Sequence, residues 1–365
     1  MTGNQVTHRN LRRWLPWAAA GIALVVGGVI GGVIVGATES SAATASPAAA
    51  QVSACEVTSV ANQALPSVVT ISVKGKGGAG TGSGEVIQSG DYIVTNNHVI
   101  AAAANGGSVE VQFADGQTAP ATIVGRDPQT DLAVIKADTS AQLKVIAIGS
   151  SASVVVGEAD VVIGAPLGLS NTVTSGIVSA LDRTIQVPGE DDKNALLVGA
   201  LQTDSAINPG NSGGAMVNCS GQLIGIPTAG ATVPTSSGES SGGSIGLGFA
   251  IPVDLAKTIS DEIITTGTVT HAYFGLQTVP IPPPAAKQAG VPEGLFVQAA
   301  VSGGPAAKAG LRPADVITKV NGEAATSNVA LQELTLTKKP GETVPVEYWR
   351  DGHSASTTIT LGTQP

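Results

Sequence analysis

The sequence predicts a mainly β protein, with an antiparallel barrel or sandwich followed by a small α+β module and preceded by one transmembrane helix. Three observations lead to this fold class. Short β-branched runs alternate with Gly, Asp and Asn turns from residue 57 to residue 251, as in all-β barrels and sandwiches. Strand and helix patterns mix over residues 271–363, and an uncharged apolar run fills residues 15–37.

The N-terminal segment is basic and then apolar. Three arginines and no acidic residue lie within residues 1–14, and the run Leu15–Ala37 is long enough to span a bilayer. The positive-inside rule therefore predicts a cytoplasmic N-terminus, a single transmembrane helix over 15–37 and an extracytoplasmic remainder. The small residues Val35–Ala37 leave a second interpretation open, a signal peptide cleaved near Ala37 and a secreted product.

Residues 38–54 are predicted to form a flexible linker, because they read TESSAATASPAAAQVSA and contain almost nothing to bury. After the linker, the first domain is expected to extend to about residue 268. Thr232–Ser244 is a Gly- and Ser-rich stretch that predicts a mobile loop, and Pro252–Thr266 has the periodicity of an amphipathic helix that Gly267 ends. The expected strands are Ser67–Val73, Glu85–Ile87, Tyr92–Thr95, Val109–Phe113, Ala121–Val124, Leu132–Lys136, Val161–Ile163, Thr172–Ser179 and Gln222–Pro227.

The second module, residues 271–363, is long enough for a small α+β domain. Its predicted helices lie near Pro305–Ala309 and Asn328–Thr337. Its predicted strands lie near Gly294–Gln298, Val316–Val320, Val344–Trp349 and Ser356–Leu361.

The composition excludes some classes of partner and site. The net charge is −9 and only 3% of residues are aromatic, so we expect no nucleic-acid partner, which would need basic surfaces and stacking platforms. Two cysteines and four scattered histidines do not have the spacing of a four-ligand zinc site, and we expect no metal and no cofactor. Cys55 and Cys219 both fall in the exported part, where a disulfide between them or two free thiols remain alternatives.

Three polar residues stand where a fold could bring them together for nucleophilic catalysis. His98 is the one histidine between residues 55 and 260, and it follows a predicted strand. Asp131 leads directly into the apolar strand at Leu132, although Asp127, Asp115 and Asp138 are rival carboxylates. Ser212 lies in the tight turn NPGNSGG, whose glycines allow successive N–H groups to approach a developing oxyanion. A serine becomes nucleophilic when a base takes its proton and a third group orients that base.

Five stretches, in this order, resemble the HtrA/DegP-type trypsin-like serine proteases: TNNHV, DPQTDLAVIK, GAPLGLSNTVTSGIVSALDR, LQTDSAINPGNSGGAMVN and GLGFAIP. The resemblance covers about residues 65–270. It implies that residues 55–268 form a double antiparallel β-barrel, the chymotrypsin-like protease fold. It further implies that the module at 271–363 is the PDZ domain that follows the protease domain in that family.

The resemblance assigns roles to the candidate residues. It implies that Ser212 is the nucleophile, His98 the general base and Asp131 the residue that orients His98. The segment Gly210–Ser212, which includes Asn211, is expected to form the oxyanion hole, mainly through the N–H groups of Gly210 and Ser212.

The residues before the nucleophile indicate the specificity pocket. Ala206 stands where trypsin places an acidic residue, so we expect no preference for Lys or Arg before the cleaved bond. Ile207 is expected to line an apolar pocket, and the family preference is for small to medium aliphatic residues.

The PDZ resemblance rests first on Tyr273, Phe274, Gly275 and Leu276, which are similar to the loop that binds a peptide's C-terminal carboxylate. The sequence therefore predicts a membrane-anchored extracytoplasmic serine endopeptidase that cuts misfolded or exposed polypeptides in protein quality control or a stress response. The alternative is a chaperone-like or PDZ adaptor scaffold with little turnover. The resemblance also implies homotrimers.

Overall fold

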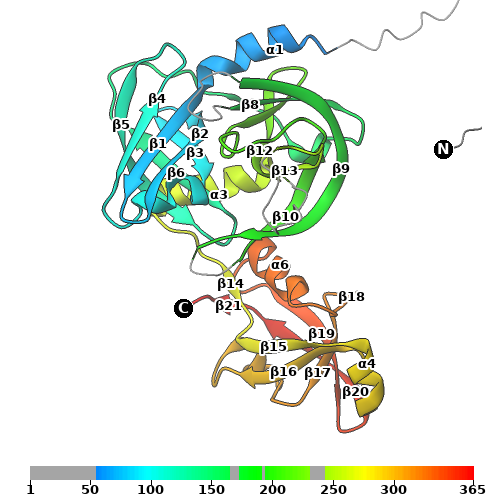
Figure 1. Ribbon diagram of the computed structural model, residues 1–365. Helices are drawn as coiled ribbons and strands as arrows, with labels where there is room; N and C mark the ends of the chain where they lie inside the picture. Colours follow the sequence, from blue (N-terminus) through cyan, green and yellow to red (C-terminus); the bar gives the residue numbers. More distant parts are fainter. Residues whose placement is uncertain (1–54, 165–171, 191–193, 231–242) are drawn as a thin grey trace, which may run out of the picture. The chain divides into compact units, whose positions relative to one another are not determined.

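The computed structural model describes residues 55–164, 172–190, 194–230 and 243–365 (Figure 1). The predicted transmembrane helix 15–37 and linker 38–54 lie outside the described residues, as does most of the predicted loop 232–244. Among the residues that are described, no helix is long and apolar enough to cross a membrane.

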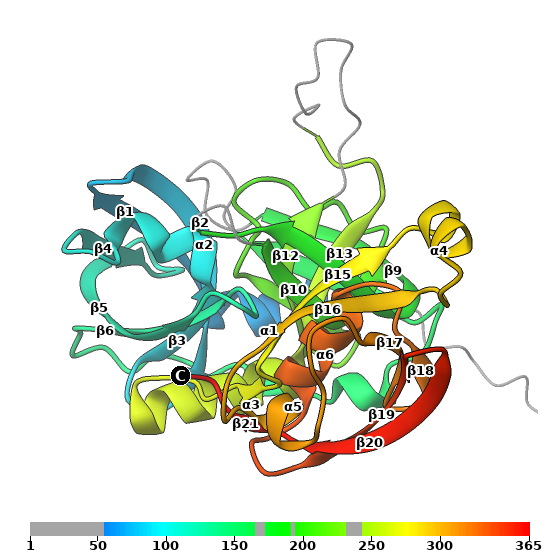
Figure 2. The same cartoon turned by 90° about the horizontal axis from the view of Figure 1, so that it is seen from below.

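The first half of the domain at residues 55–268 is a closed six-stranded antiparallel barrel with the order β1-β2-β3-β6-β5-β4, seen as a ring in Figure 2. Alternate residues such as Ile71, Ile93 and Ile135 fill its interior and are fully buried. Two short helices, α2 (Asn97–Ile100) and η2 (Ala101–Ala103), follow β3. The strands are β1 (Val68–Gly75), β2 (Gly78–Gln88), β3 (Tyr92–Asn96), β4 (Ser108–Gln112), β5 (Thr118–Asp127) and β6 (Leu132–Ala137).

The second half is a seven-stranded sheet in which the pairing of β11 with β12 closes six strands into another barrel. Helix α3 (Val253–Thr266) follows and ends at Gly267, whose φ of 79° is left-handed. The helix η3 (Ser151–Ser153) precedes β8. The strands are β7 (Ala147–Ile148), β8 (Ala159–Gly164), β9 (Thr172–Pro188), β10 (Asn194–Thr203), β11 (Ala215–Asn218), β12 (Gln222–Gly230) and β13 (Gly248–Pro252).

The two barrels share one hydrophobic core, which includes Val94 and Leu132 from the first and Ile163 and Leu197 from the second. Helix α1 (Val57–Ala64), continued by η1 (Leu65–Ser67), packs Val60 and Ala64 onto this core. The mainly β class and the double barrel are therefore confirmed. The shared core holds the two barrels together, so polar residues of one barrel can contact residues of the other, as described below.

Several strands were not predicted, or, like β2 at Glu85–Ile87, were predicted only in part, and the reason is physical. Strand β10 reads NALLVGALQT and has buried residues on both faces, so it lacks the alternation that marks a half-exposed strand. Strand β2 starts at Gly78, inside a glycine-rich stretch that has low intrinsic strand preference. At Gly84 a side chain would overlap Ile93 and Ile71, so packing against β1 and β3 requires glycine there.

The C-terminal module has a six-stranded antiparallel sheet and three helices within residues 272–363. Its core includes Phe274, Leu295, Ile317 and Val344. The helices are α4 (Pro283–Ala289), α5 (Pro305–Lys308) and α6 (Val329–Thr337). The strands are β14 (Ala272–Tyr273), β15 (Leu276–Ile281), β16 (Gly294–Ala300), β17 (Val316–Val320), β18 (Glu323–Ala324), β19 (Thr343–Arg350), β20 (His353–Thr360) and β21 (Gly362–Thr363), of which β14 and β21 form a separate pair.

Candidate active site

Asp131 ends the turn between β5 and β6 and has a left-handed backbone, with φ of 59°. Aspartate tolerates this conformation better than most residues. Its carbonyl accepts hydrogen bonds from Asn96 Nδ2 at 2.9 Å and from the Asn97 N–H at 3.0 Å. The end of β3 and the start of α2 therefore hold the main chain of Asp131, whose side chain is buried.

His98 lies on α2, directly after β3, and faces the same carboxylate. Its Nδ1 is 2.8 Å from Asp131 Oδ2 and 3.0 Å from Oδ1. The His98 N–H also donates to Oδ1 at 3.0 Å. The Asp131 side chain is 4% exposed and that of His98 is 40% exposed, so one edge of the imidazole is fixed while the ring stays open to solvent and substrate.

Thr228 on β12 contacts two of the candidate residues, and no sequence pattern had indicated it. Its Oγ1 donates a hydrogen bond to Asp131 Oδ2 at 2.5 Å, and its carbonyl accepts one from Ser212 Oγ at 3.3 Å. Within the described residues, no hydrogen bond joins Ser212 Oγ to His98. The structure thus brings His98 and Asp131 into contact, whereas the Ser212 hydroxyl is hydrogen-bonded to the Thr228 carbonyl.

The turn that carries Ser212 leaves two particular N–H groups free. The N–H of Asn211 donates to Asn208 O at 3.0 Å, that of Gly213 to Pro227 O at 2.8 Å and that of Gly214 to Asn211 O at 3.0 Å. In the described part of the chain, the N–H groups of Gly210 and Ser212 have no such partner. The N–H of Asn211, which was expected in the oxyanion hole together with the other two, donates within the turn instead.

The first barrel holds this turn through Ser83 on β2. Its Oγ donates to Gly210 O at 2.6 Å, and its N–H donates to Ser212 O at 2.9 Å. Gly213 has φ of 79°, and a side chain there would overlap Thr95 and the Ser83 carbonyl. The glycine after the serine is thus required by close approach of the two barrels.

The two residues expected at the specificity pocket lie just before this turn. The Ala206 carbonyl accepts hydrogen bonds from Thr174 Oγ1 at 3.1 Å and from Asn211 Nδ2 at 3.2 Å. Ile207 is 4% exposed. Its side chain lies against Gly248 and its carbonyl against Gly230, so a side chain at either glycine position would press against Ile207. Ala206 and Ile207 are both apolar, and neither supplies an acidic group.

A buried carboxyl group, that of Asp160, accepts hydrogen bonds from the residues that lead to Ala206. Asp160 on β8 accepts hydrogen bonds from Ser205 Oγ at 2.6 Å and Thr203 Oγ1 at 2.7 Å. Burial raises the pKa of Asp160, and the two hydroxyl donors offset only part of that effect. Asp160 thereby fixes the strand end that leads to Ala206.

The second module contains a cavity of about 470 Å³ between β15 and α6. Its lining includes the predicted residues Tyr273, Phe274, Gly275 and Leu276. Leu331 of α6 also lines it, and together with Phe274 and Leu276 makes one end apolar. Gly275 has φ of 72°, which turns the loop toward the start of β15.

The two cysteines are joined. Cys55 and Cys219 form a disulfide, with their Cα atoms 5.2 Å apart and 164 positions between them in sequence. The bond ties the start of α1 to the hairpin after β11. Over the described ranges, no group of three or more His, Cys, Asp or Glu side chains is arranged to hold a metal ion.

Residues 82–226 match the trypsin-like peptidase domain, and residues 272–361 match the PDZ domain. The chain is 41% identical over 356 residues to the serine protease PepD of Mycobacterium tuberculosis, covering 94% of this chain and 75% of PepD. It is 38% identical over 288 residues to the periplasmic pH-dependent serine endoprotease DegQ of Escherichia coli, covering 78% of this chain and 60% of DegQ. A DegP-like endoprotease of Rhizobium meliloti is 38% identical over 286 residues, which is 78% of this chain and 53% of that protein.

Solved structures of HtrA-type proteases have the same fold. The protease AlgW with a decapeptide superposes with a TM-score of 0.66 at 32% identity, covering 85% of this chain and 99% of that one. The serine endoprotease from Yersinia pestis superposes with a TM-score of 0.62 at 33% identity, covering 85% and 98%. The chain spans between about half and three fifths of the length of its DegP-like and DegQ relatives.

Proposed function

Because the chain belongs to the HtrA family of trypsin-like serine endoproteases with a PDZ domain, we propose that it is anchored in the cytoplasmic membrane and cleaves misfolded or exposed polypeptides outside the cytoplasm. The main observation that supports this chemistry is the contact between His98 Nδ1 and Asp131 Oδ2 at 2.8 Å. Ser212 lies on a turn whose Gly210 and Ser212 N–H groups have no hydrogen-bond partner among the described residues. These are the parts that acyl transfer needs.

In the proposed mechanism, Ser212 Oγ rotates from Thr228 O toward His98 and attacks the scissile carbonyl while His98 Nε2 takes its proton. Asp131 holds Nδ1 and stabilises the imidazolium that forms. The N–H groups of Gly210 and Ser212 donate to the oxyanion of the tetrahedral intermediate. His98 then protonates the leaving amine, and water hydrolyses the acyl enzyme by the same route in reverse.

The proposed cleavage preference is for small to medium aliphatic residues. Ile207 occupies the space beside Gly230 and Gly248, and Ala206 supplies no carboxylate to pair with a cationic side chain. A pocket of this kind gains free energy from burying a few methyl groups and none from charge.

The PDZ domain is proposed to bind peptide C-termini. Tyr273–Leu276 and Leu331 line the cavity between β15 and α6, and a peptide could add as a strand to β15 with its carboxylate at the loop. The apolar end of the cavity fits an apolar terminal residue. Bound peptides in the AlgW structures support this use of the module.

Labelling with a fluorophosphonate probe tests the chemistry directly. The intact protein should label, and Ser212→Ala and His98→Ala should not. Ser220→Ala is the matched control, because Ser220 is an exposed serine on the hairpin after β11, and this variant should label as the wild type does. Wild-type labelling no stronger than that of Ser212→Ala would refute the assignment of the nucleophile.

The proposed location rests on the apolar run at residues 15–37 and on periplasmic relatives such as DegQ. Membrane fractionation with N-terminal sequencing tests it. An intact N-terminus in the membrane fraction is expected, whereas a soluble protein beginning after Ala37 would show a cleaved signal peptide. The trimer implied by the family resemblance is tested by light scattering of the purified protein.

A further inference from the structure

A second His–Asp pair lies behind the turn that carries Asp131. His271 Nε2 is 2.9 Å from Asp127 Oδ1, and the two side chains are 7% and 3% exposed. His271 belongs to the connector between α3 and β14, and Asp127 is the last residue of β5. The proposed catalytic chemistry uses neither residue, so this buried polar contact needs another explanation.

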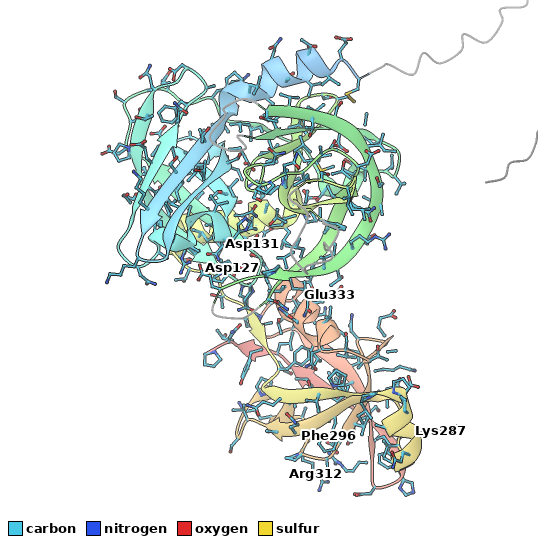
Figure 3. The ribbon with its side chains drawn as sticks, viewed as in Figure 1. Asp127, Asp131, Lys287, Phe296, Arg312 and Glu333 are labelled. Atoms are coloured by element: carbon cyan, nitrogen blue, oxygen red, sulfur yellow. A yellow bond between two sulfur atoms is a disulfide. The ribbon has the colours of Figure 1, made fainter. Side chains whose placement is uncertain are left out.

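Asp127 closes the turn from its first residue. Its Oδ2 accepts a hydrogen bond from Thr130 Oγ1 at 2.5 Å, and its Oδ1 accepts one from the Gln129 N–H at 3.2 Å. The turn therefore folds around one carboxylate and ends four residues later at Asp131, where the backbone is left-handed. Figure 3 shows Asp127 and Asp131 close together. A strained residue keeps its conformation only where its surroundings determine it.

The connector is itself held at this place. The His271 carbonyl accepts a hydrogen bond from the Gln364 N–H at 3.0 Å, and Gln364 Oε1 accepts one from Gln129 Nε2 at 2.9 Å. Directly after His271, β14 pairs with β21. Both residues of the His271–Asp127 contact are thus held in place: Asp127 by its hydrogen bonds within the turn, and His271 by its hydrogen bond to Gln364 beside the paired strands β14 and β21.

We propose that His271 is a positioning residue for the protease reaction. Its hydrogen bond to Asp127 holds the turn so that the Asp131 carboxylate stays against His98, and the connector to the PDZ domain is thereby part of the catalytic scaffold. This inference rests on the proposed triad. It assigns to His271 no contact with substrate and no transfer of a proton.

The test compares His271→Leu, which removes the donor, with His271→Gln, which keeps an Nε2 donor of similar reach, in the full-length protein. Turnover of a short chromogenic peptide is measured first. For His271→Leu we expect kcat to fall about tenfold, with KM within about twofold, because a hydrogen bond to a charged group is lost. His271→Gln should recover most of the activity. Asp127→Asn combined with His271→Leu should be far from additive.

A second readout does not depend on turnover. The amides of Asn97 and His98 both donate to Asp131, so their hydrogen exchange reports the position of this residue. Exchange at these two amides should be about tenfold faster in His271→Leu than in the wild type, because both donors lose a fixed acceptor.

Two controls separate positioning from general loss of stability. His353→Leu removes an exposed histidine of the same module, and Val344→Ala destabilises the PDZ core, where Val344 is fully buried; neither should change kcat or the two exchange rates. Unchanged kcat and exchange in His271→Leu would overturn the proposal, as would failure of the glutamine to restore either one. An inactive wild type that fails to label would instead count against the proposed triad, and the exchange rates would still decide the role of His271.

Discussion

Thr228 Oγ1 donates a hydrogen bond to Asp131 Oδ2 at 2.5 Å, across 97 positions of sequence. The same residue offers its carbonyl to Ser212 Oγ at 3.3 Å. One residue of the second barrel therefore helps to set the orientation of the carboxylate and the resting rotamer of the proposed nucleophile.

The first prediction concerns this hydroxyl. Thr228→Val keeps the shape of the side chain but removes one of the two donors to Asp131 Oδ2, so that only His98 Nδ1 remains; losing a hydrogen bond to a charged acceptor costs about 1.5 to 3 kcal/mol. We expect kcat/KM on a peptide substrate to fall at least about tenfold. Thr228→Ser retains the hydroxyl and should keep most of the activity. Equal rates for the valine and wild-type proteins would show that His98 alone holds Asp131.

The pocket beside Ile207 gives a prediction on specificity. Ile207→Ala removes side-chain atoms that lie against Gly248, so it should deepen the space for the residue before the cleaved bond. Relative kcat/KM for Leu over Ala at that position should rise about tenfold, since each methylene contributes about 1 to 3 kcal/mol in such a pocket. Peptide pairs that differ only there measure the ratio, and an unchanged ratio would place the pocket elsewhere.

Glu85 on β2 predicts an unusual dependence of stability on pH. Its carboxyl is fully buried, and neither oxygen has a hydrogen-bond partner within the described residues. Burial raises the pKa of Glu85 well above its ordinary value of 4.5. When the pH rises above 4.5, the unfolded chain loses this proton while the folded protein keeps it. The free energy of unfolding therefore falls as the pH rises toward the folded-state pKa of Glu85.

Glu85→Gln mimics the neutral carboxyl at every pH. The variant should match the wild type near pH 4 and become steadily more stable than it as the pH rises above the ordinary Glu pKa toward the raised one, by at most about 1.4 kcal/mol for each pH unit. Urea unfolding across this range measures the difference. Glu110→Gln, at an exposed position on β4, is the control and should give a constant offset. A constant offset for Glu85→Gln as well would contradict the buried neutral state.

Two residues that line the PDZ cavity, Asn328 and Thr278 of β15, are hydrogen-bonded to each other. Asn328 Nδ2 donates to Thr278 O at 3.1 Å, and Thr278 Oγ1 donates to Asn328 Oδ1 at 2.7 Å. Asn328→Ala frees the β15 carbonyl, so labelled peptides with an apolar C-terminal residue should bind up to about tenfold more tightly, the value of one or two net hydrogen bonds. Fluorescence polarisation on the Ser212→Ala background measures this without cleavage. The exposed neighbour Thr326 provides the control, Thr326→Ala, and weaker binding by Asn328→Ala would mean that Asn328 contacts the peptide instead.

The disulfide gives a prediction on stability. Because it joins Cys55 to Cys219 across 164 positions, the chain-entropy model gives a stabilisation of about 4 to 5 kcal/mol at most. The double variant Cys55→Ser/Cys219→Ser should unfold at lower urea, and dithiothreitol should shift the wild type to the same midpoint. If reduction does not move the midpoint, the packing of α1 on the shared core, through Val60 and Ala64, is sufficient by itself.

The local pattern of apolar and turn-forming residues predicted an element correctly where the conformation of a segment depends mainly on its own residues. The helix expected at Pro252–Thr266 is α3, ending at the predicted Gly267, and the strand expected at Val316–Val320 has those bounds. The pattern failed at β10, whose apolar residues are buried on one face in the shared core and on the other face against Leu336 of α6, and so show no alternation. It also failed at β15 and α4, where prolines lie in a strand at the edge of the sheet and in the first turn of a helix, two positions that tolerate them.

The sequence by itself determined the mainly β class, the family resemblance and the candidates His98, Asp131 and Ser212, because these depend on residue type and order along the chain. Only the tertiary structure decided what each polar group faces. In the structure, Asp131 is hydrogen-bonded to the hydroxyl of Thr228 and Asp127 to the ring of His271, whereas the Glu85 carboxyl has no hydrogen-bond partner within the described residues. The physical reason is distance in sequence: packing of the second barrel and of the connector after α3 against the first barrel brings together atoms that are 97 and 144 positions apart, and no local pattern carries that information.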